Sequence, residues 1–342
     1  MSLYIVSFTA LVLSIILTGL VRQYALNRSI IDVPNERSSH TIPTPRGGGL
    51  AIVVVLLMAI GYCYLINIFS LVFMLALGGG IFIVAIVGWI DDHKHIPALF
   101  RAMLYALAAI WAITWINREF PLYIEAYRFP FSLLGHIFII LGIVWLTNLF
   151  NFMDGTDALA GMESICVSSA VCFLFFLEGQ LGMMLVSAVI FTSCCGFLFW
   201  NWPPAKIFMG DVGSCSLGFC FGIMAVLSEL TNSVSMAIWF VLLAVFICDA
   251  TFTLLMRIIR REKWYKAHKT HAYQRLVLCG MSHKKLVSLV SVINILILWP
   301  LAWLIYQDKT LIPAILSFVI LLMFILWGTI QIYYYRKIRN EN

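Results

Sequence analysis

The sequence has little charge and no long hydrophilic stretch. Only 11% of its 342 residues are charged, 62% are hydrophobic, and the mean hydropathy is +0.98. This balance lies well beyond that of soluble domains and argues against a soluble helical core. The chain instead supplies apolar stretches of about 20 residues, the length that crosses ~30 Å of hydrocarbon.

The sequence also has no C-x-x-C pair, which weighs against a zinc site or a disulfide framework. Its nine cysteines lie mostly inside hydrophobic stretches, where small apolar side chains serve helix packing. They are Cys63, Cys166, Cys172, Cys194, Cys195, Cys215, Cys220, Cys248 and Cys279. Gly218 and Gly222 form a G-x-x-x-G pattern, which close packing between membrane helices explains.

The hydrophobic stretches predict an all-α polytopic membrane protein with about 11 transmembrane helices. The expected spans are 3–21, 47–66, 71–90, 98–116, 132–150, 161–177, 182–200, 214–228, 236–256, 286–305 and 311–335. In the first span Arg22 follows the apolar run and no small-x-small cleavage site comes after it. We therefore expect this span to remain as a membrane anchor rather than to be removed as a signal peptide.

Lysine and arginine are distributed unequally between the two sides of the predicted membrane. The gaps after odd-numbered spans hold 19 of them: Arg22, Arg28, Arg37, Arg46, Lys94, Arg101, Lys206, Arg257, Arg260, Arg261, Lys263, Lys266, Lys269, Arg275, Lys284, Lys285, Arg336, Lys337 and Arg339. The other side holds 3, namely Arg118, Arg128 and Lys309. The positive-inside rule then predicts an outside N-terminus and a cytoplasmic C-terminus.

The acidic motifs recur after alternate spans and therefore emerge on the same, cytoplasmic, face. Asp91 and Asp92 follow the third span, Asn151 to Asp157 the fifth, Asp211 the seventh, and His268 to His271 the ninth. We expect one membrane domain over 1–342, with active-site loops at 22–46, 91–97, 151–160, 201–213 and 257–285. Oxygen ligands beside cationic loops are what Mg²⁺ and phosphate groups require.

Two adjacent carboxylates at a membrane boundary are costly unless a cation or a catalytic role uses them. Adjacent helical side chains diverge by about 100°, so one of Asp91 and Asp92 could face the site while the other orients neighbours. A solvated helix end is the plain alternative. His93 and His95 could be read as a metal pair, but without further ligands they are better read as polar loop residues.

A second group of polar residues comprises Asn148, Asn151, Asp154 and Asp157. Their spacing is helical, which predicts side chains stacked on one face at successive turns. Amides beside carboxylates suit a nucleotide and a metal ion, and a plain polar helix cap is the alternative. Asp211 stands between glycines just before a helix, so a simple N-cap is its alternative role.

Basic segments provide candidate phosphate contacts. Arg46 precedes three glycines that enter a helix, where backbone amides could face an anion; an ordinary flexible loop is equally compatible. His268 and His271, at i and i+3, are predicted to share a helical face, and phosphate binding fits better than zinc. Arg260, Arg261 and Lys263 could instead contact anionic lipids.

Together these residues resemble the polyprenyl-phosphate N-acetylhexosamine-1-phosphate transferases. The resemblance covers nearly the whole chain: Asp91-Asp92, the segment from Asn148 to Asp157, Met209-Gly210-Asp211 and the basic His-x-x-His loop. Pro34 to Arg37 and Pro45 to Gly49 are most similar to the branch that initiates O-antigen synthesis. The triple-histidine loop of the peptidoglycan phospho-N-acetylmuramoyl-pentapeptide transferases is absent, which counts against a muramyl-peptide donor.

The resemblance implies a reaction in which undecaprenyl phosphate attacks the β-phosphorus of a UDP-N-acetylhexosamine and UMP leaves. It implies Mg²⁺, with Mn²⁺ as the alternative, held by Asp211 and Asn151. The implied catalytic residues are Asp91, Asp92, Asp154 and Asp157. The implied substrate-binding residues are Arg46, Asn148, Asn151, Lys206, His268 and His271. Whether Asp91 or Asp92 acts as a base, a nucleophile or a positioning group stays open, and a covalent phosphosugar intermediate is an alternative.

The same resemblance implies a multi-pass protein of the bacterial inner membrane whose site faces the cytoplasm, in contact with membrane lipids and not with nucleic acid. A homodimer stays open, as does the donor sugar. The rival from another class is a cation-coupled transporter, which would place ionisable residues near the bilayer midplane on broken helices. Only Asp249 lies clearly within a span, about two turns from Arg257. From the cytoplasmic half of the span it could hold residues of the site in place without contacting the substrate.

Overall fold

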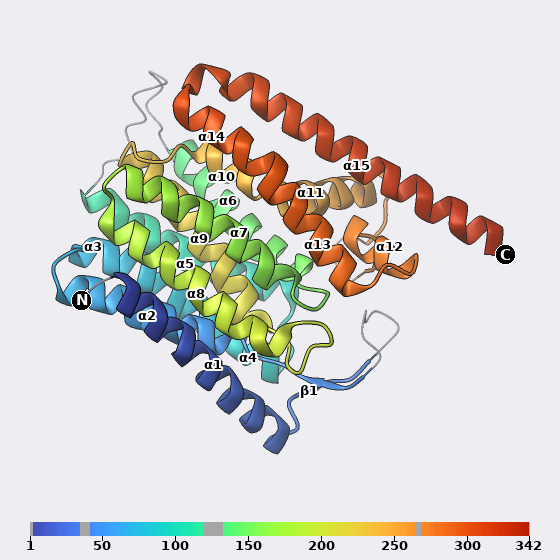
Figure 1. Cartoon of the computed structure of the whole chain (residues 1–342), viewed down its shortest axis with the longest axis horizontal. Coiled ribbons are helices and arrows are strands. Elements are labelled where there is room, and N and C mark those ends of the chain that lie inside the picture. Colours follow the sequence, from blue (N-terminus) through green and yellow to red (C-terminus); the bar gives the residue numbers. More distant parts are fainter. Residues whose placement is uncertain (1–2, 35–41, 120–132, 264–267, 342) are drawn as a thin grey trace.

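The computed structural model describes residues 3–34, 42–119, 133–263 and 268–341 of the chain. In this part the protein is a bundle of long helices, with the N-terminus and the C-terminus at opposite ends (Figure 1). Of the predicted features, Asn35, Glu36 and Arg37 lie outside the described residues.

The first half of the chain contains six long helices and one short hairpin. In order the elements are α1 (Leu3–Asn27), β1 (Ile31–Asp32), β2 (Thr44–Pro45), α2 (Leu50–Leu65), α3 (Leu71–Phe73), the π-helix η1 (Met74–Gly79), α4 (Gly80–His93), α5 (Ala98–Glu119), α6 (Leu133–Met153) and α7 (Leu159–Leu177). Strands β1 and β2 pair antiparallel, with Ile31 opposite Pro45 and Asp32 opposite Thr44.

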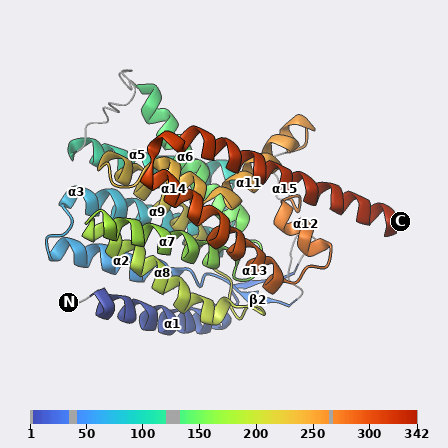
Figure 2. The same cartoon turned by 45° about the horizontal axis from the view of Figure 1, so that its top comes forward.

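Within its described residues, the regular elements of the second half are all helices. It comprises α8 (Leu181–Asn201), α9 (Asp211–Leu230), α10 (Met236–Leu242), α11 (Ala244–Ile259), α12 (Ala272–Leu278), α13 (His283–Ile293), the π-helix η2 (Asn294–Leu298), α14 (Trp299–Gln307), the 3-10 turn η3 (Lys309–Leu311) and α15 (Ile312–Glu341). Helix α15 runs along the outside of the bundle, and its C-terminal end projects beyond it (Figure 2).

The predicted fold class is confirmed. Among the described residues, nine helical segments are long and apolar enough to cross a membrane, and α10 with α11 adds a tenth as one span bent by 77°. The shorter apolar helix α2 corresponds to the remaining predicted span. Which end of the bundle faces the cytoplasm stays a prediction from the charge distribution.

Helix α9 lies at the centre of the bundle. Its most apolar window is 94% buried, against 17% for α1 and 22% for the last span. Small residues make this position possible: a Cβ atom added to Gly218 would lie 2.6 Å from the Leu146 carbonyl oxygen of α6. The side of Gly222 also faces α6, at Ile143, so the close-packing interpretation of the G-x-x-x-G pattern is confirmed.

Glycines also let α2, α4 and α9 touch through their backbones at one end of the bundle. A Cβ atom on Gly88 of α4 would lie 2.6 Å from both Cα and N of Val212 in α9. A Cβ atom on Gly49, just before α2, would lie 2.4 Å from Cα of Gly213. Because any side chain would separate these helices, the glycines fix how closely the start of α9 approaches the end of α4.

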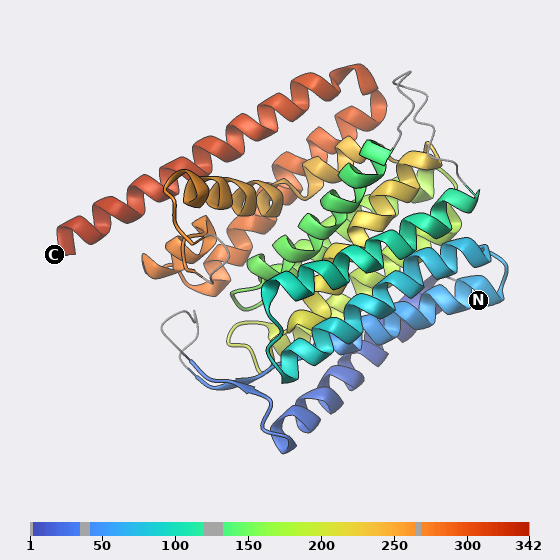
Figure 3. The same cartoon turned by 180° about the vertical axis from the view of Figure 1, so that it is seen from behind.

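The same end of the bundle carries the motif loops. The β1–β2 hairpin, α12 and the loops before α7 and α9 gather there, on the side to which α15 projects (Figures 1 and 3). The predicted convergence of the acidic and histidine motifs at one end of the molecule is therefore confirmed for the described residues.

Candidate active site

Asp92 caps the start of α9 from another helix. Its two carboxylate oxygens accept hydrogen bonds from the backbone N–H groups of Asp211, at 3.0 Å, and Val212, at 3.2 Å. The residue before α9 is Gly210, which has no side chain to cap the helix and adopts φ +76. The first N–H groups of a helix lack internal partners and favour negative charge, so Asp92 serves as the N-cap of α9.

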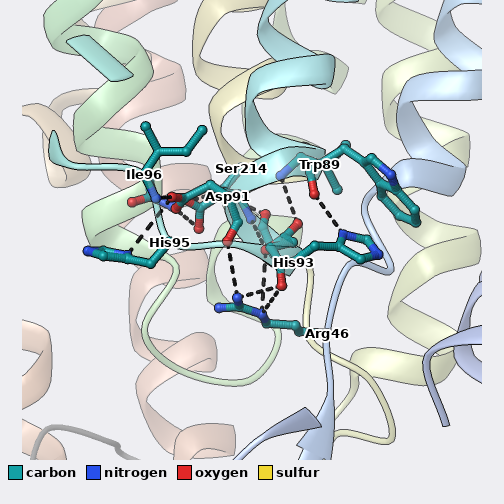
Figure 4. A network of polar contacts seen from close by, with 12 residues as sticks. Arg46, Trp89, Asp91, His93, His95, Ile96 and Ser214 are labelled. Carbon is teal, nitrogen blue, oxygen red and sulfur yellow. Dashed lines mark hydrogen bonds and ion pairs between the residues drawn. The ribbon is translucent and has the colours of Figure 1, made fainter. Parts of the chain in front are cut away.

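Arg46 binds the C-terminal end of α4. Its guanidinium donates to the carbonyl oxygens of Asp91, at 3.2 Å, and Asp92, at 3.0 and 2.5 Å (Figure 4). Its Nε also lies 3.8 Å from the Asp92 carboxylate. A cation here satisfies the last carbonyls of the helix and complements its dipole. In this structure Arg46 therefore stabilises the aspartate pair, and its side chain remains 34% exposed.

Two of the three glycine amides after Arg46 are already hydrogen-bonded and so are not available to an anion as predicted. The N–H of Gly48 donates to the carbonyl of Phe208 at 2.9 Å, and that of Gly49 to the carbonyl of Met209 at 2.8 Å. These bonds instead fasten the start of α2 to the segment that leads into α9.

Asp91 and Asp211 share a positive charge that the sequence did not single out. Nη1 of Arg101, near the start of α5, contacts Asp91 Oδ2 at 2.5 Å and also Asp211 Oδ2. All three side chains are largely buried. Asp91 and Asp92 thus diverge as predicted, one toward Arg101 and one toward the backbone of α9. In the sequence, the one indication of this contact was that Arg101 follows the aspartate pair after a single short loop.

The amide of Asn151 points at Asp211. Its Nδ2 donates to Asp211 Oδ1 at 2.9 Å and to Ser214 Oγ at 3.3 Å, which leaves the Asn151 carbonyl oxygen as an acceptor. Asn148, one turn earlier, donates to the Val144 carbonyl of its own helix at 2.7 Å. Asn151 therefore belongs to the carboxylate cluster, whereas Asn148 bonds back to its own helix.

The predicted helical column from Asn148 to Asp157 is wrong beyond Met153, where α6 ends. Asp154 lies in the loop that follows, and no hydrogen bond to its carboxylate is found within the described parts of the chain. Burial raises the pKa of Asp154, and the nearby charges of Asp211 and Asp92 raise it further. Asp154 is thus in a region of excess negative charge.

Asp157 ties three segments together instead of facing the cluster. Its Oδ2 accepts a hydrogen bond from the N–H of Ala205 at 3.1 Å and lies 3.2 Å from Nδ1 of His283, the first residue of α13. The side chain is buried. Asp157 thus holds the loop after α6 against α13 and the segment before α9, and its catalytic role stays a prediction.

His268 and His271 lie together, but not on a helix. His271 is the residue before α12, and the two rings stack with their centroids 4.9 Å apart. The shared helical face was a wrong prediction, because the extended backbone at His271 (φ −61, ψ 147) produces the contact. Burial lowers the pKa of His268 to about 3, with further contributions from His271 and Arg257, so this ring is neutral at pH 7.

Asp249 positions the histidine segment from inside α11. It accepts hydrogen bonds from the N–H groups of Ala272, at 2.8 Å, and Tyr273, at 3.2 Å, and lies 3.6 Å from Nδ1 of His271. Tyr273 in turn donates its hydroxyl to the carbonyl of Phe152 at 2.8 Å. These contacts agree with the expectation that Asp249 holds residues of the site in place. They link α11, α12 and the end of α6.

Three further polar candidates are exposed at the surface. Lys206 has its ammonium 5.7 Å from the centroid of the Trp200 ring. His93 bonds to the Trp89 carbonyl at 2.8 Å, and the His95 side chain, 87% exposed, has its Nδ1 3.9 Å from Asp91 Oδ1 (Figure 4). No group of three His, Cys, Asp or Glu side chains suited to a metal occurs in the described residues.

The donor set nevertheless fits Mg²⁺. Four carboxylates (Asp91, Asp92, Asp154 and Asp211) stand against two guanidinium groups, and Mg²⁺ is usually held by one or two carboxylates together with waters and substrate phosphates. A divalent cation would balance the negative charge that raises the pKa of Asp154.

Comparison with known proteins shows the family to which the chain belongs. The family model described as glycosyl transferase family 4 matches residues 74–229, from η1 to α9. A probable undecaprenyl-phosphate N-acetylglucosaminyl 1-phosphate transferase of Bacillus subtilis (strain 168) is 33% identical over 301 residues, which cover 85% of this chain and 82% of that protein. The chain belongs to glycosyl transferase family 4.

Two further relatives have different substrates in their names. A decaprenyl-phosphate N-acetylglucosaminephosphotransferase of Mycolicibacterium smegmatis is 29% identical over 318 residues, covering 84% of this chain and 78% of that protein. A phospho-N-acetylmuramoyl-pentapeptide-transferase of Thermotoga petrophila is 27% identical over 229 residues, covering 64% and 72%. The predicted family resemblance is confirmed, and both types of transferase are among the relatives.

Proposed function

We propose that the protein transfers an N-acetylhexosamine 1-phosphate group from a UDP-sugar to undecaprenyl phosphate. The products are an undecaprenyl-diphosphate sugar and UMP. The names of the family 4 relatives support the general activity, and the missing triple-histidine loop favours an N-acetylhexosamine over a muramyl-peptide donor. The sequence is most similar to the branch of the family that initiates O-antigen synthesis, so we propose that the reaction begins O-antigen or lipopolysaccharide synthesis.

The placement of Asp211 carries the proposal. It begins the central helix, where Asp92, Arg101 and Asn151 surround it and Asp154 adds negative charge. Phosphoryl transfer needs charge neutralisation and alignment more than covalent help, and this cluster offers both anionic ligands and a cation. Cation transport is the weaker reading, because these carboxylates lie at helix ends.

In the proposed reaction an oxygen of the lipid phosphate forms a bond to the β-phosphorus of the donor. The bond between that phosphorus and the bridging oxygen breaks, and the oxygen leaves with the electron pair as part of UMP. A phosphate monoester is already largely ionised near neutral pH, since its second pKa is ~6. Positioning therefore matters more than proton abstraction for at least one of Asp91 and Asp92.

Each side chain has a distinct task in this reaction. Asp92 and Arg46 hold the ends of α9 and α4 in register, and Arg101 offers positive charge between Asp91 and Asp211. Neutral His268, with His271, donates hydrogen bonds to donor phosphates. Asp211 and Asn151 would hold Mg²⁺, which when bound neutralises phosphate charge.

The fate of the β-phosphate tests the reaction type. With donor labelled at the β-phosphorus, purified protein, undecaprenyl phosphate and Mg²⁺, we expect the label in a lipid diphosphate and one UMP per transfer. Attack at the sugar carbon would instead leave the label in UDP. Thin-layer chromatography of the lipid and aqueous phases separates the two, and labelled UDP would rule out the phosphosugar mechanism.

The proposed location is the bacterial inner membrane with the site on the cytoplasmic face. A Lys269→Cys variant is accordingly expected to react with a membrane-impermeant thiol reagent only after the cytoplasmic side is opened, as is Lys94→Cys. Glu125→Cys, at a position outside the described residues, should react from the outside. Labelling is compared with a cysteine-free parent; modification of Lys269→Cys in intact cells would reverse the assigned orientation.

A further inference from the structure

A cavity lies apart from the carboxylate cluster, between the end of α11, α12 and α15. Its volume is about 260 Å³. None of the four clustered aspartates lines it, and Thr270 is where it meets the histidine segment. The helices that form it lie on the outer side of the bundle in Figure 3.

The wall of this cavity is cationic. Arg257, Arg260 and Arg275 line it, and Glu262 is the carboxylate among its lining residues. Glu262 pairs with Arg257 at 2.8 Å. Within the described parts of the chain, Arg260 and Arg275 have no carboxylate within 4.0 Å, so the cavity holds more positive than negative charge.

Arg275 is the buried member of the set, with only 5% of its surface exposed. It donates to Gln331 and, at 3.2 Å, to the hydroxyl of Tyr335, both on α15. Its Nε, like that of Arg257, is buried without a hydrogen-bond partner among the described residues. Leaving a buried charged donor unsatisfied is costly, and a bound anion would remove that cost.

A phosphate group fits these donors in both charge and shape. Guanidinium groups bind phosphate through paired N–H donors, which makes arginine the common choice for this ligand. Arg260 also reaches Tyr335, donating to its hydroxyl at 2.8 Å, so two of the arginines converge on one point of α15.

Apolar side chains also line the cavity and lie exposed beside it. Trp327, Met256 and Ile332 contribute to its lining, and Ile332 is 55% exposed. Beside it on α11, Leu255 and Ile259 are 49% and 75% exposed. A ligand with both a phosphate and apolar chains matches this combination better than a free anion, because basic side chains at a membrane surface attract anionic lipids.

We propose that this cavity is an accessory site for the phosphate group of an anionic phospholipid, separate from the substrate site. The lipid phosphate would offset part of the positive charge of the three arginines while its chains lie along α11 and α15. Gln331 joins the cavity to the histidine segment by donating to the carbonyl of Thr270 at 3.5 Å. The bound lipid therefore also holds the loop that carries His268.

The test uses the full chain purified in detergent, with lipid binding followed by native mass spectrometry and thermal unfolding. The pocket variant is Arg257→Gln with Arg260→Gln. The charge-matched control is Arg336→Gln with Arg339→Gln, two exposed arginines of α15 that do not line the cavity. The ligands are phosphatidylglycerol, phosphatidylcholine and inorganic phosphate.

We expect phosphatidylglycerol, and not phosphatidylcholine, to bind the parent protein and raise its unfolding temperature. The pocket variant should bind phosphatidylglycerol at least tenfold more weakly, while the control variant binds as the parent does. Equal binding by pocket variant and parent overturns the proposal. Equal stabilisation by inorganic phosphate would make this a free-anion site, and displacement of phosphatidylglycerol by undecaprenyl phosphate would make it part of the acceptor site; either result also overturns it.

Discussion

An Asp211→Asn variant is expected to lose nearly all transferase activity while staying folded. Losing a charged ligand of a catalytic cation should cost about 4 kcal/mol of transition-state stabilisation, or ~10³-fold in rate. Asparagine keeps the size of the side chain and an oxygen that can accept from Arg101 or Asn151. UMP release at saturating Mg²⁺ measures the loss, and thermal unfolding with size-exclusion chromatography checks the fold.

Asp308→Asn is the matched control, since it removes one carboxylate at the exposed turn before α15. Its activity should equal that of the parent. Turnover by Asp211→Asn within tenfold of the parent would mean that the metal is held elsewhere, even though the family assignment would stand.

The second large effect is expected at Asp92, and it should differ in kind from the effect at Asp91. Asp92→Asn removes the negative charge that caps α9 and pairs with Arg46, so we expect both activity and stability to fall. Loss of a helix cap and a charged hydrogen bond together is worth about 2 kcal/mol. Asp91→Asn should reduce activity with a smaller change in stability, because Asp91 bonds chiefly to a loop N–H and to Arg101.

Parallel measurements of kcat and of apparent unfolding temperature on the two variants separate these effects. Asp308→Asn again serves as the control for removal of one charge. Equal losses of stability in Asp91→Asn and Asp92→Asn would contradict the division of roles drawn from their hydrogen bonds.

Much of the architecture follows from hydropathy alone. A membrane span must be apolar for about 20 residues regardless of which helices pack beside it. Each predicted span therefore corresponds to a helix in the described residues. The meeting of Asp91, Asn151 and Asp211 at one end follows from counting spans. The divergence of the two adjacent aspartate side chains also follows from helix geometry.

Local spacing failed where the backbone leaves the helix. Asp154 and Asp157 continue the three-residue spacing of Asn148 and Asn151, but α6 ends at Met153. Gly155 lies against the hydroxyl of Tyr273, a contact from a distant part of the chain that spacing cannot reveal. For the same reason Asp157 bonds to Ala205 and His283 instead of joining the cluster.

The role of Arg101 could not be read from the sequence because it depends on tertiary structure. Arginines near span ends are common, and the positive-inside rule already accounts for them. What distinguishes this one is the simultaneous approach to Asp91 and Asp211, residues 10 and 110 positions away along the chain. Such a bridge exists only after α4, α5 and α9 have packed.

The contact of Gly88 with Val212 has a consequence for biosynthesis. A ribosome delivers α4 to the membrane long before α9, so the Asp92 carboxylate must wait without the N–H groups that it later binds. During that interval the end of α4 carries its two acids beside Arg46 and Arg101 alone. Only the emergence of the loop before α9 and of α9 itself supplies these N–H groups, so this end of the bundle is completed late in translation. Chains truncated before Asp211 should accordingly be recognised by membrane quality control as unfinished.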